Sequence, residues 1–339
     1  MLNHQIKSSS PLLDKRGSLV QKGYATQGLL VYNRKQIKTP PWRIKEWDFY
    51  QVSNNDYCLQ LTIGHVSYAG SISVSLIDWN TNRTYNVTKL LPLPFNRLGM
   101  PASAETGDLI YKSNLIDIEF LVFEGGRRLI CQTRDKQGPP MDIDVHLMQP
   151  DLASMVIATP FDDNPRYFYY NHKINCMPAE GMVSVGDKKY PFEPDTAFGL
   201  LDWGRGVWPF SHEWFWGNGS GIINGKRFGF NIGFGFGNTE TATENMLFYD
   251  GTAHKLNQVH VDLLAGGYMA KKKFTSDDGR FEMEFTPIYD HFTSTKKLFV
   301  DNCCHQVFGK FSGTAVLDDG TILEVHDLLA FMEHAVNNW

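Results

Sequence analysis

Apolar and polar residues alternate along much of this chain of 339 residues. The period is two rather than 3.6, which is the pattern of a β-strand with one face towards a core and the other towards water. Because antiparallel sheets commonly leave one face in water, we expect antiparallel sheets. The segments with the cleanest alternation are Ser71–Leu76, Asp117–Phe120, Asp142–Leu147 and Phe281–Phe285.

Turn signals separate these expected strands at short intervals. Asn-Gly or Asp-Gly pairs occur at residues 224–225, 250–251, 278–279 and 319–320. Such pairs favour type I′ hairpins, because both central residues need a positive φ. No amphipathic helix longer than about three turns is expected in the body of the chain. Only the last segment, Glu333–Trp339, is compatible with a short helical tail.

Many short strands in a chain of this length predict an all-β protein with two tandem barrels or sandwiches. The stretch Met177–Pro194 contains three prolines and is the best candidate for a linker. We therefore expect an N-terminal β domain at residues 1–185 and a C-terminal β domain at residues 186–339.

One expected strand, Phe228–Phe236, has two very different faces. One face carries four phenylalanines and an isoleucine, and the other carries only three glycines and Asn231. Glycine inside a strand packs against nothing, so another group is expected to fill the space on that face. The group is either another part of the protein or a ligand, in which case Asn231 is the polar contact.

Composition and charge exclude several classes of function. A net charge of -5 argues against a nucleic-acid partner. The chain shows no signal-peptide pattern and no apolar run long enough to span a bilayer, so we expect a cytoplasmic protein. The five cysteines form no CxxC pair, and no histidines have metal-ligand spacing. We expect no metal and no nucleotide cofactor, and the sequence sets no oligomeric state.

The strongest candidate for chemistry is the segment Leu200–Gly221. It contains Asp202 and Arg205, with one glycine between them and another directly after Arg205. We expect the backbone to turn sharply at these glycines and the Asp202 and Arg205 side chains to form an ion pair. Among indole rings a carboxyl group loses solvation and favours its protonated form, whereas a neighbouring guanidinium favours the carboxylate. Asp202 is therefore either a general acid or base or half of an ion pair that organises a loop.

Four of the eight tryptophans lie in the same segment, at Trp203, Trp208, Trp214 and Trp216. Trp214 and Trp216 fall on one face of an expected strand, and His212 shares that face. Aromatic faces line apolar pockets, stack on sugar rings and stabilise cations. A core position explains any single tryptophan, but the group as a whole favours a binding pocket.

Other segments supply further candidates, each of which has a structural explanation as well. Trp47 lies in a segment that mixes charged and aromatic residues, and Asp78 precedes Trp79 in an apolar-Asp-Trp pattern like that around Asp202. Near the C-terminus, His326 and Glu333 are candidate site residues. Surface charge pairs and aromatic residues at strand edges are common and account for these patterns better than a catalytic role does.

The chain resembles the bacterial family that carries the label domain of unknown function 2804. The resemblance runs over nearly the full length and depends on Ser10–Asp14, Tyr32–Arg34, Arg43–Tyr50, Leu201–Gly206 and Leu317–Trp339. That family is distantly similar to lipocalin-like tandem β-barrel proteins of the carotenoid hydratase and tocopherol cyclase type. The resemblance implies two barrels side by side with a pocket near their junction, and it fixes no reaction.

Three functions are compatible with these features. The first is a cofactor-independent lyase or isomerase that hydrates, isomerises or cyclises a small, largely apolar substrate. In it, Asp202, Arg205, His212 and Glu333 are catalytic, and Trp47, Asp78, Trp203, Trp208, Trp214, Trp216, Asn231 and His326 bind the substrate. The second is a non-catalytic carrier or sensor of a hydrophobic ligand. The third is a glycoside-active enzyme that uses Asp202 and a second carboxylate.

Overall fold

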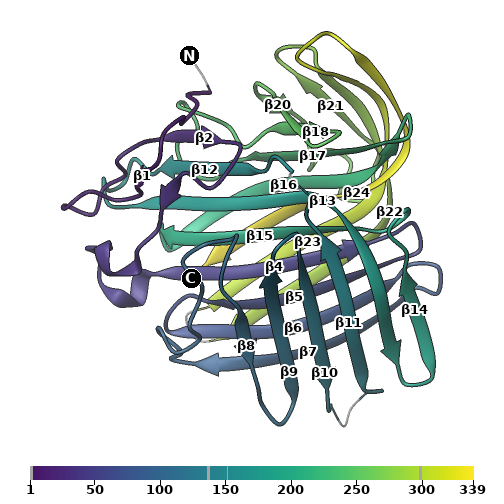
Figure 1. Ribbon diagram of the computed structural model, residues 1–339, viewed down its shortest axis with the longest axis horizontal. Coiled ribbons are helices and arrows are strands. Elements are labelled where there is room, and N and C mark those ends of the chain that lie inside the picture. The colour runs from purple at the N-terminus through teal and green to yellow at the C-terminus, as the bar shows by residue number, and fades with distance from the viewer. Residues whose placement is uncertain (1–2, 136–137, 151, 298–299) are drawn as a thin grey trace.

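The computed structural model describes residues 3–135, 138–150, 152–297 and 300–339. Over these residues the chain forms two curled antiparallel sheets, each bent into a half-barrel (Figure 1). This confirms the predicted all-β tandem architecture. The helical segments of the described chain are two 3-10 turns, η1 (Arg34–Gln36) and η2 (Pro41–Arg43). Neither is long or apolar enough to cross a bilayer.

The first sheet has 13 strands within the described chain. Its main order is β7 (Arg83–Pro92), β6 (Ala69–Asp78), β5 (Tyr57–His65), β4 (Lys45–Ser53), β15 (Phe198–Val207), β13 (Phe168–Val185), β11 (Met141–Met148), β10 (Gly126–Thr133), β9 (Ile116–Phe123) and β8 (Leu109–Tyr111). Off this path lie β12 (Met155–Pro160) and β14 (Lys188–Phe192), which pair with β13, and β2 (Gly23–Ala25), which pairs with β12. A separate parallel pair joins β1 (Ser10–Pro11) to β3 (Leu30–Val31).

The second sheet has nine described strands. Their order is β19 (Thr252–Lys255), β18 (Met246–Tyr249), β17 (Lys226–Phe234), β16 (Ser211–Ile223), β24 (Ile322–Asn338), β23 (Val300–Val316), β22 (Phe281–Lys297), β21 (Lys272–Ser276) and β20 (Val259–His260).

The alternating segments of the sequence lie where strands were expected, in β6, β9, β11 and β22. The type I′ hairpin signals are confirmed at two of the four pairs, because at 278–279 and 319–320 only the glycine has a positive φ. Asn224 joins β16 to β17 and Asp250 joins β18 to β19, and each has a φ of 51° followed by a glycine with positive φ. Both central residues of each turn therefore adopt the left-handed conformation that a type I′ hairpin requires.

The short helix considered for Glu333–Trp339 is wrong, because β24 continues as a strand to Asn338. β24 lies inside the sheet, with β16 on one side and β23 on the other. His334, for example, lies opposite Phe215 on one side and His305 on the other. Pairing on both sides outweighs the weak local preference for a helix.

The chain passes from the first sheet to the second between Val207 in β15 and Ser211 in β16. The stretch Met177–Pro194 holds the end of β13 and all of β14, both within the first sheet. The strands between residues 186 and 207 therefore belong to the first sheet. The division into domains at residues 1–185 and 186–339 stays a prediction.

Each half-barrel encloses its own apolar core, built from alternate residues of its strands. Leu59, Leu61 and Ile63 of β5 are fully buried in the first core. Phe230 and Phe311 pack together in the second core, with ring centroids 4.9 Å apart. The residues between these positions face outward, and the outward faces of the two sheets pack against each other.

The packing between the sheets forms two further buried clusters. In one cluster Cys58 and Leu200 of the first sheet contact Phe308 and Phe331 of the second. The other cluster joins β12 and β13 to β18 and to the segments around Trp208 and Phe236. The two half-barrels therefore share an apolar interface that is as well buried as their own cores.

The glycine face of β17 belongs to this interface. A Cβ atom at Gly229 would lie 2.4 Å from Cys176 Sγ of β13, and one at Gly233 would lie 2.3 Å from the Glu244 carboxyl carbon. Other parts of the protein therefore fill the space beside both glycines. Of the two explanations left open by the sequence, packing within the protein is the one the structure supports.

Candidate active site

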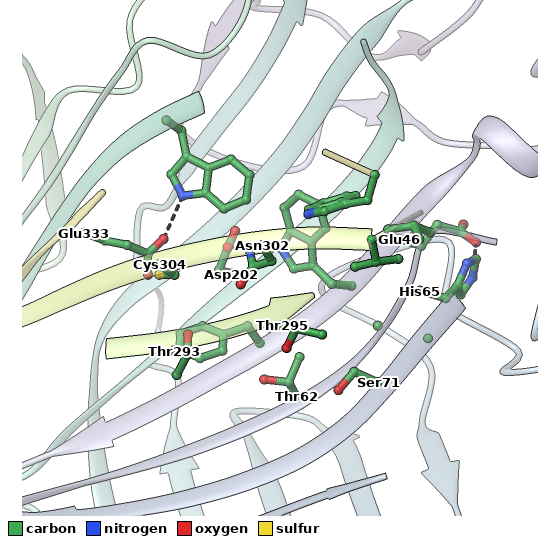
Figure 2. Close-up of a pocket in the computed structure, with 18 of the residues that line it drawn as sticks. Glu46, Thr62, His65, Ser71, Asp202, Thr293, Thr295, Asn302, Cys304 and Glu333 are labelled. Atoms are coloured by element: carbon green, nitrogen blue, oxygen red, sulfur yellow. Dashed lines mark hydrogen bonds and ion pairs between the residues drawn. The ribbon is translucent and has the colours of Figure 1, made fainter. Parts of the chain in front are cut away.

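A cavity of about 440 Å³ lies where the outward faces of the two sheets meet. Its walls come from β4–β7, β13 and β15 of the first sheet and from β16 and β22–β24 of the second. Figure 2 shows Asp202 from the first sheet and Glu333 and Cys304 from the second extending into the same space. A cavity of this volume can hold a small organic molecule.

A buried lysine holds two carboxyl groups together at one wall of the cavity. Lys173 on β13 lies directly opposite Asp202 on β15. Its Nζ is 3.7 Å from Asp202 Oδ1 and 2.7 Å from Glu244 Oε2. Burial acts to lower the pKa of Lys173, but the charges of Glu244 and Asp202 outweigh burial and raise it. Lys173 is therefore a cation locked in a buried ionic cluster.

The Asp202 carboxyl group accepts hydrogen bonds on both oxygens. Asn171 Nδ2 donates to Oδ1 at 2.5 Å, and the indole Nε1 of Trp47 donates to Oδ2 at 3.0 Å. With the Lys173 ammonium nearby, this is the donor arrangement of an ionised carboxylate. Asp202 is 7% exposed, so its remaining contact is with the cavity.

The Glu333 carboxyl group on β24 accepts from the same kinds of donor, but no ion pair holds it among the described residues. Trp214 Nε1 donates to Oε1 at 2.7 Å, and Gln306 Nε2 donates to Oε2 at 3.1 Å. Burial raises the pKa of Glu333 to about 7 and the charge of Asp202 adds to this, while the hydrogen bond from Trp214 acts in the opposite direction. Glu333 is therefore protonated in a large share of molecules at neutral pH.

Three of the predicted tryptophans line the cavity beside these carboxyl groups, namely Trp47, Trp214 and Trp216. Phe49 packs edge-on against Trp216, with ring centroids 6.1 Å apart. The Lys173 ammonium lies 4.9 Å from the centre of the Trp216 ring, on its face. Aromatic rings in this arrangement attract positive charge.

Another part of the cavity lining carries small hydroxyl side chains beside apolar ones such as Leu90, which lies opposite Ser71. Thr62 and Ser71 come from the first sheet, and Thr293 and Thr295 come from β22 of the second. Figure 2 shows these four side chains grouped on one side of the carboxyl groups. Thr293 is exposed to solvent, which places the mouth of the cavity at this part of the lining.

Arg205 does not pair with Asp202, so that prediction is wrong. Residues 198–207 form a continuous strand rather than a glycine turn, and side chains three residues apart in a strand point to opposite faces. Arg205 is fully buried inside the first half-barrel, where it donates to Asp48 Oδ1 at 2.8 Å and stacks on Trp203 at 4.0 Å. It organises the core and lies outside the cavity lining.

Trp203, Trp208 and His212 also lie outside the cavity lining. Trp203 is buried in the first core, and Trp208 is buried in the interface between the sheets. His212 stacks on Trp214 and accepts from Trp208 Nε1 at 3.3 Å. Burial lowers the pKa of His212 to about 3, with Lys45 adding to the effect, so the imidazole is neutral and supports the aromatic wall from behind.

Asp78, His326 and Asn231 do not reach the cavity. Asp78 accepts from Tyr190 at 3.3 Å near the end of β6, and His326 is an exposed residue of β24. Asn231 is fully buried and accepts from Trp216 Nε1 at 2.8 Å. The Asn231 amide also donates to the backbone carbonyl of Glu244 at 2.9 Å, so it positions two residues that line the cavity.

No pattern in the sequence marks Lys173, Glu244 or Cys304, which all line the cavity. Lys173 belongs to an alternating run of polar residues on β13, which looks like a strand face in water. Glu244 lies in a connection between β17 and β18 that no motif marks. Cys304 hydrogen-bonds to Glu333, and burial raises the pKa of its thiol well above the ordinary value. These three residues are far apart in the sequence and come together only in the folded protein.

Among the described residues, no group of three or more His, Cys, Asp or Glu side chains has the arrangement of a metal site. The carboxyl groups at the cavity are instead engaged with Lys173, with tryptophan N–H groups and with amide N–H groups.

Comparison with known families identifies the chain. The model of the family described as domain of unknown function (DUF2804) matches residues 3–339. The chain belongs to this family. The predicted resemblance is therefore confirmed over the whole described length, and no curated protein sequence matches the chain.

Two crystal structures are similar to this member of the DUF2804 family. One is of a protein provisionally called AttH from Nitrosomonas europaea, with a TM-score of 0.53, 13% identity and coverage of 86% of this chain and 92% of that chain. The other is of kievitone hydratase from Nectria haematococca, with a TM-score of 0.53, 9% identity and coverage of 96% and 98%. At such low identity the similarity shows a shared fold.

Proposed function

We propose that this protein is a cofactor-independent lyase or isomerase that acts on a carbon–carbon double bond of a small, largely apolar molecule. One observation carries the proposal. Glu333, with a pKa of about 7, faces the same tryptophan-lined cavity as Asp202, which is held by Lys173. A proton donor and a proton acceptor thus flank one apolar space, and one neighbour of the same fold is a hydratase.

The first step is protonation of the double bond by Glu333. The protonated carboxyl group transfers H⁺ to one alkene carbon, so the π bond breaks and a C–H bond forms. Positive charge then develops on the other carbon. The faces of Trp214 and Trp216 stabilise this charge, as does the Glu333 carboxylate that the step creates. General acid catalysis of this kind contributes about 10² to 10⁴ in rate.

The second step completes either of two reactions at Asp202. In hydration, water adds to the cationic carbon through its oxygen and gives up a proton to the Asp202 carboxylate. In isomerisation, Asp202 removes a proton from a neighbouring carbon and a shifted double bond forms. In both reactions Asp202 returns the proton to Glu333 through solvent, so no oxidant or cofactor is consumed.

Two other functions use the same residues. A carrier of a hydrophobic ligand needs only the apolar part of the cavity. A glycoside-active enzyme is favoured by the presence of two carboxyl groups and several tryptophans at one cavity. Release of sugar from aryl glycosides would support the glycosidase, and copurification of an unaltered ligand without any turnover would support the carrier.

The proposal is tested by incubating the protein with a panel of isoprenoid alkenes in D₂O and analysing the products by mass spectrometry. We expect solvent deuterium at carbon, with or without the mass of added water. Glu333→Gln and Asp202→Asn should each lower turnover by about 100-fold or more. Glu324→Gln, an exposed residue on the same strand as Glu333, is the matched control. Full turnover by Glu333→Gln would contradict the proposal.

A further inference from the structure

Near its mouth the cavity lining carries several hydroxyl groups that have no partner within the described protein, beside apolar residues such as Leu90. Thr62 of the first sheet and Thr295 of the second both contribute hydroxyls to this lining. Neither hydroxyl has a hydrogen-bond partner among the described residues, and both residues are partly exposed. Ser71 and Thr293 line the same part of the cavity in the same way.

Hydroxyl groups without a protein partner bind a wholly apolar ligand poorly, because they keep their hydrogen bonds to water only when the ligand is absent. An alkyl group placed against it would remove water from the hydroxyls without replacing the lost hydrogen bonds, which costs free energy for each group. A ligand with its own hydroxyl or carbonyl groups at that position would replace them. The hydroxyls come from both sheets, so such a ligand can be held from two sides.

The charges around the cavity favour neutral ligands over anionic ones. Its lining includes Asp202 and Glu244, two carboxyl groups that share one cation, Lys173. The lining residue Glu46 is already paired with Arg34 and with His65. A carboxylate or phosphate ligand would therefore meet negative charge without a free cation from the described lining, which disfavours binding of anions.

We infer that the substrate is a neutral amphipathic molecule, with an unsaturated apolar segment between Asp202 and Glu333 and with hydroxyl or carbonyl groups against Thr62 and Thr295. This inference rests on the proposed function for the orientation of the molecule. It adds to that function the chemical class of the substrate and the two residues, Thr62 and Thr295, that select this class. The polar end lies at the mouth and the reacting end lies at the tryptophans.

The test measures binding rather than turnover, so its failure is distinguishable from failure of the proposed function. The probes are geraniol, geranic acid and the hydrocarbon in which hydrogen replaces the hydroxyl group of geraniol. Their binding is followed by quenching of tryptophan fluorescence. We expect the wild-type protein to bind geraniol at least about fivefold more tightly than geranic acid.

The double variant Thr62→Val, Thr295→Val removes both hydroxyls and keeps the shape of the side chains and their preference for strands. It should bind geraniol at least about fivefold more weakly than wild type and bind the hydrocarbon as well or better. Thr286→Val, at an exposed position on β22 outside the cavity lining, is the matched control and should bind all three probes like wild type.

Three outcomes would overturn the inference. These are equal binding of geraniol by the wild type and the double variant, tighter binding of geranic acid than of geraniol by the wild type, and no binding of geraniol. None of them bears on whether Glu333→Gln loses turnover. Conversely, an active Glu333→Gln variant would remove the proposed mechanism and leave the selection of neutral amphipathic ligands standing.

Discussion

At the scale of single residues, the two carboxyl groups at the cavity differ through their neighbours. Asp202 accepts from Asn171 and Trp47 and lies near the Lys173 ammonium. Glu333 also accepts from an indole and an amide and is also buried, but it has no ion pair among the described residues. Under the proposed mechanism one carboxyl group therefore accepts a proton and the other donates one, a division of roles that paired acids show in known enzymes.

The raised pKa of Glu333 predicts a pH dependence of activity. The proposed acid must be protonated, so turnover should fall as the pH rises through about 7. A profile of turnover against pH measures this limb directly. Glu324→Gln should keep the limb near 7, and a flat profile from pH 5 to 9 would contradict the role of Glu333 as the acid.

The same pKa predicts a change in stability. The unfolded chain has the ordinary value near 4.5, so the stability that protonated Glu333 provides is fully present below pH 4.5 and is lost as the pH rises through about 7. Relative to wild type, Glu333→Gln should therefore gain up to about 3 kcal/mol in free energy of unfolding between pH 5 and pH 8. Urea titrations at the two pH values measure the difference, which should be absent for Glu324→Gln.

At the scale of single elements, the alternation of side chains along each strand decides which residues share a face of the sheet. The sequence shows the strands clearly, because the period of two is a local property. It does not show which strands are neighbours, so the pairing of Lys173 with Asp202 could not be predicted. The expected pair of Asp202 and Arg205 failed because the glycines beside them suggest a turn, whereas strand pairing keeps β15 straight through them. Trp214 and Trp216 share one strand face, which is visible locally, and both line the cavity. Trp47 and Glu333 also line it, although the sequence marks them only as members of segments that mix charged and aromatic residues.

Because β17 lies very close to β13, adding one methyl group at Gly229 should destabilise the protein. Gly229→Ala would place a Cβ 2.4 Å from Cys176 Sγ and 2.8 Å from the Gly219 carbonyl oxygen. We expect a loss of about 1 to 3 kcal/mol in free energy of unfolding. Gly138→Ala, at a position with open space around it, is the control and should change stability by less than about 0.5 kcal/mol. Equal stability of the two variants would contradict the packing described for the glycine face.

At the scale of the whole molecule, the two half-barrels are joined by buried apolar clusters and by the N-terminal segment. Asn3 and His4 bond to residues 256 and 241 next to the second sheet, while Tyr24 pairs this segment with the first sheet. Neither sheet can separate without exposing the residues of the interface to water.

Shared burial predicts that both half-barrels unfold together. Differential scanning calorimetry should show one transition, with a calorimetric enthalpy close to the van't Hoff enthalpy. Two resolved transitions would show that the interface contributes little to the stability of either sheet. Gly229→Ala, which disturbs this interface, should lower the midpoint of the single transition rather than split it.

Because one wall of the cavity belongs to each sheet, a bound molecule acts as a cross-link between the two halves of the fold. Any compound that fits only the folded protein raises its melting temperature by mass action, by the equivalent of about 2.7 kcal/mol at 100 times its dissociation constant. The melting temperature is therefore a reporter of occupancy that requires neither a label nor knowledge of the reaction. A library of neutral unsaturated alcohols and ketones, ranked by thermal shift, offers a direct route to the natural ligand.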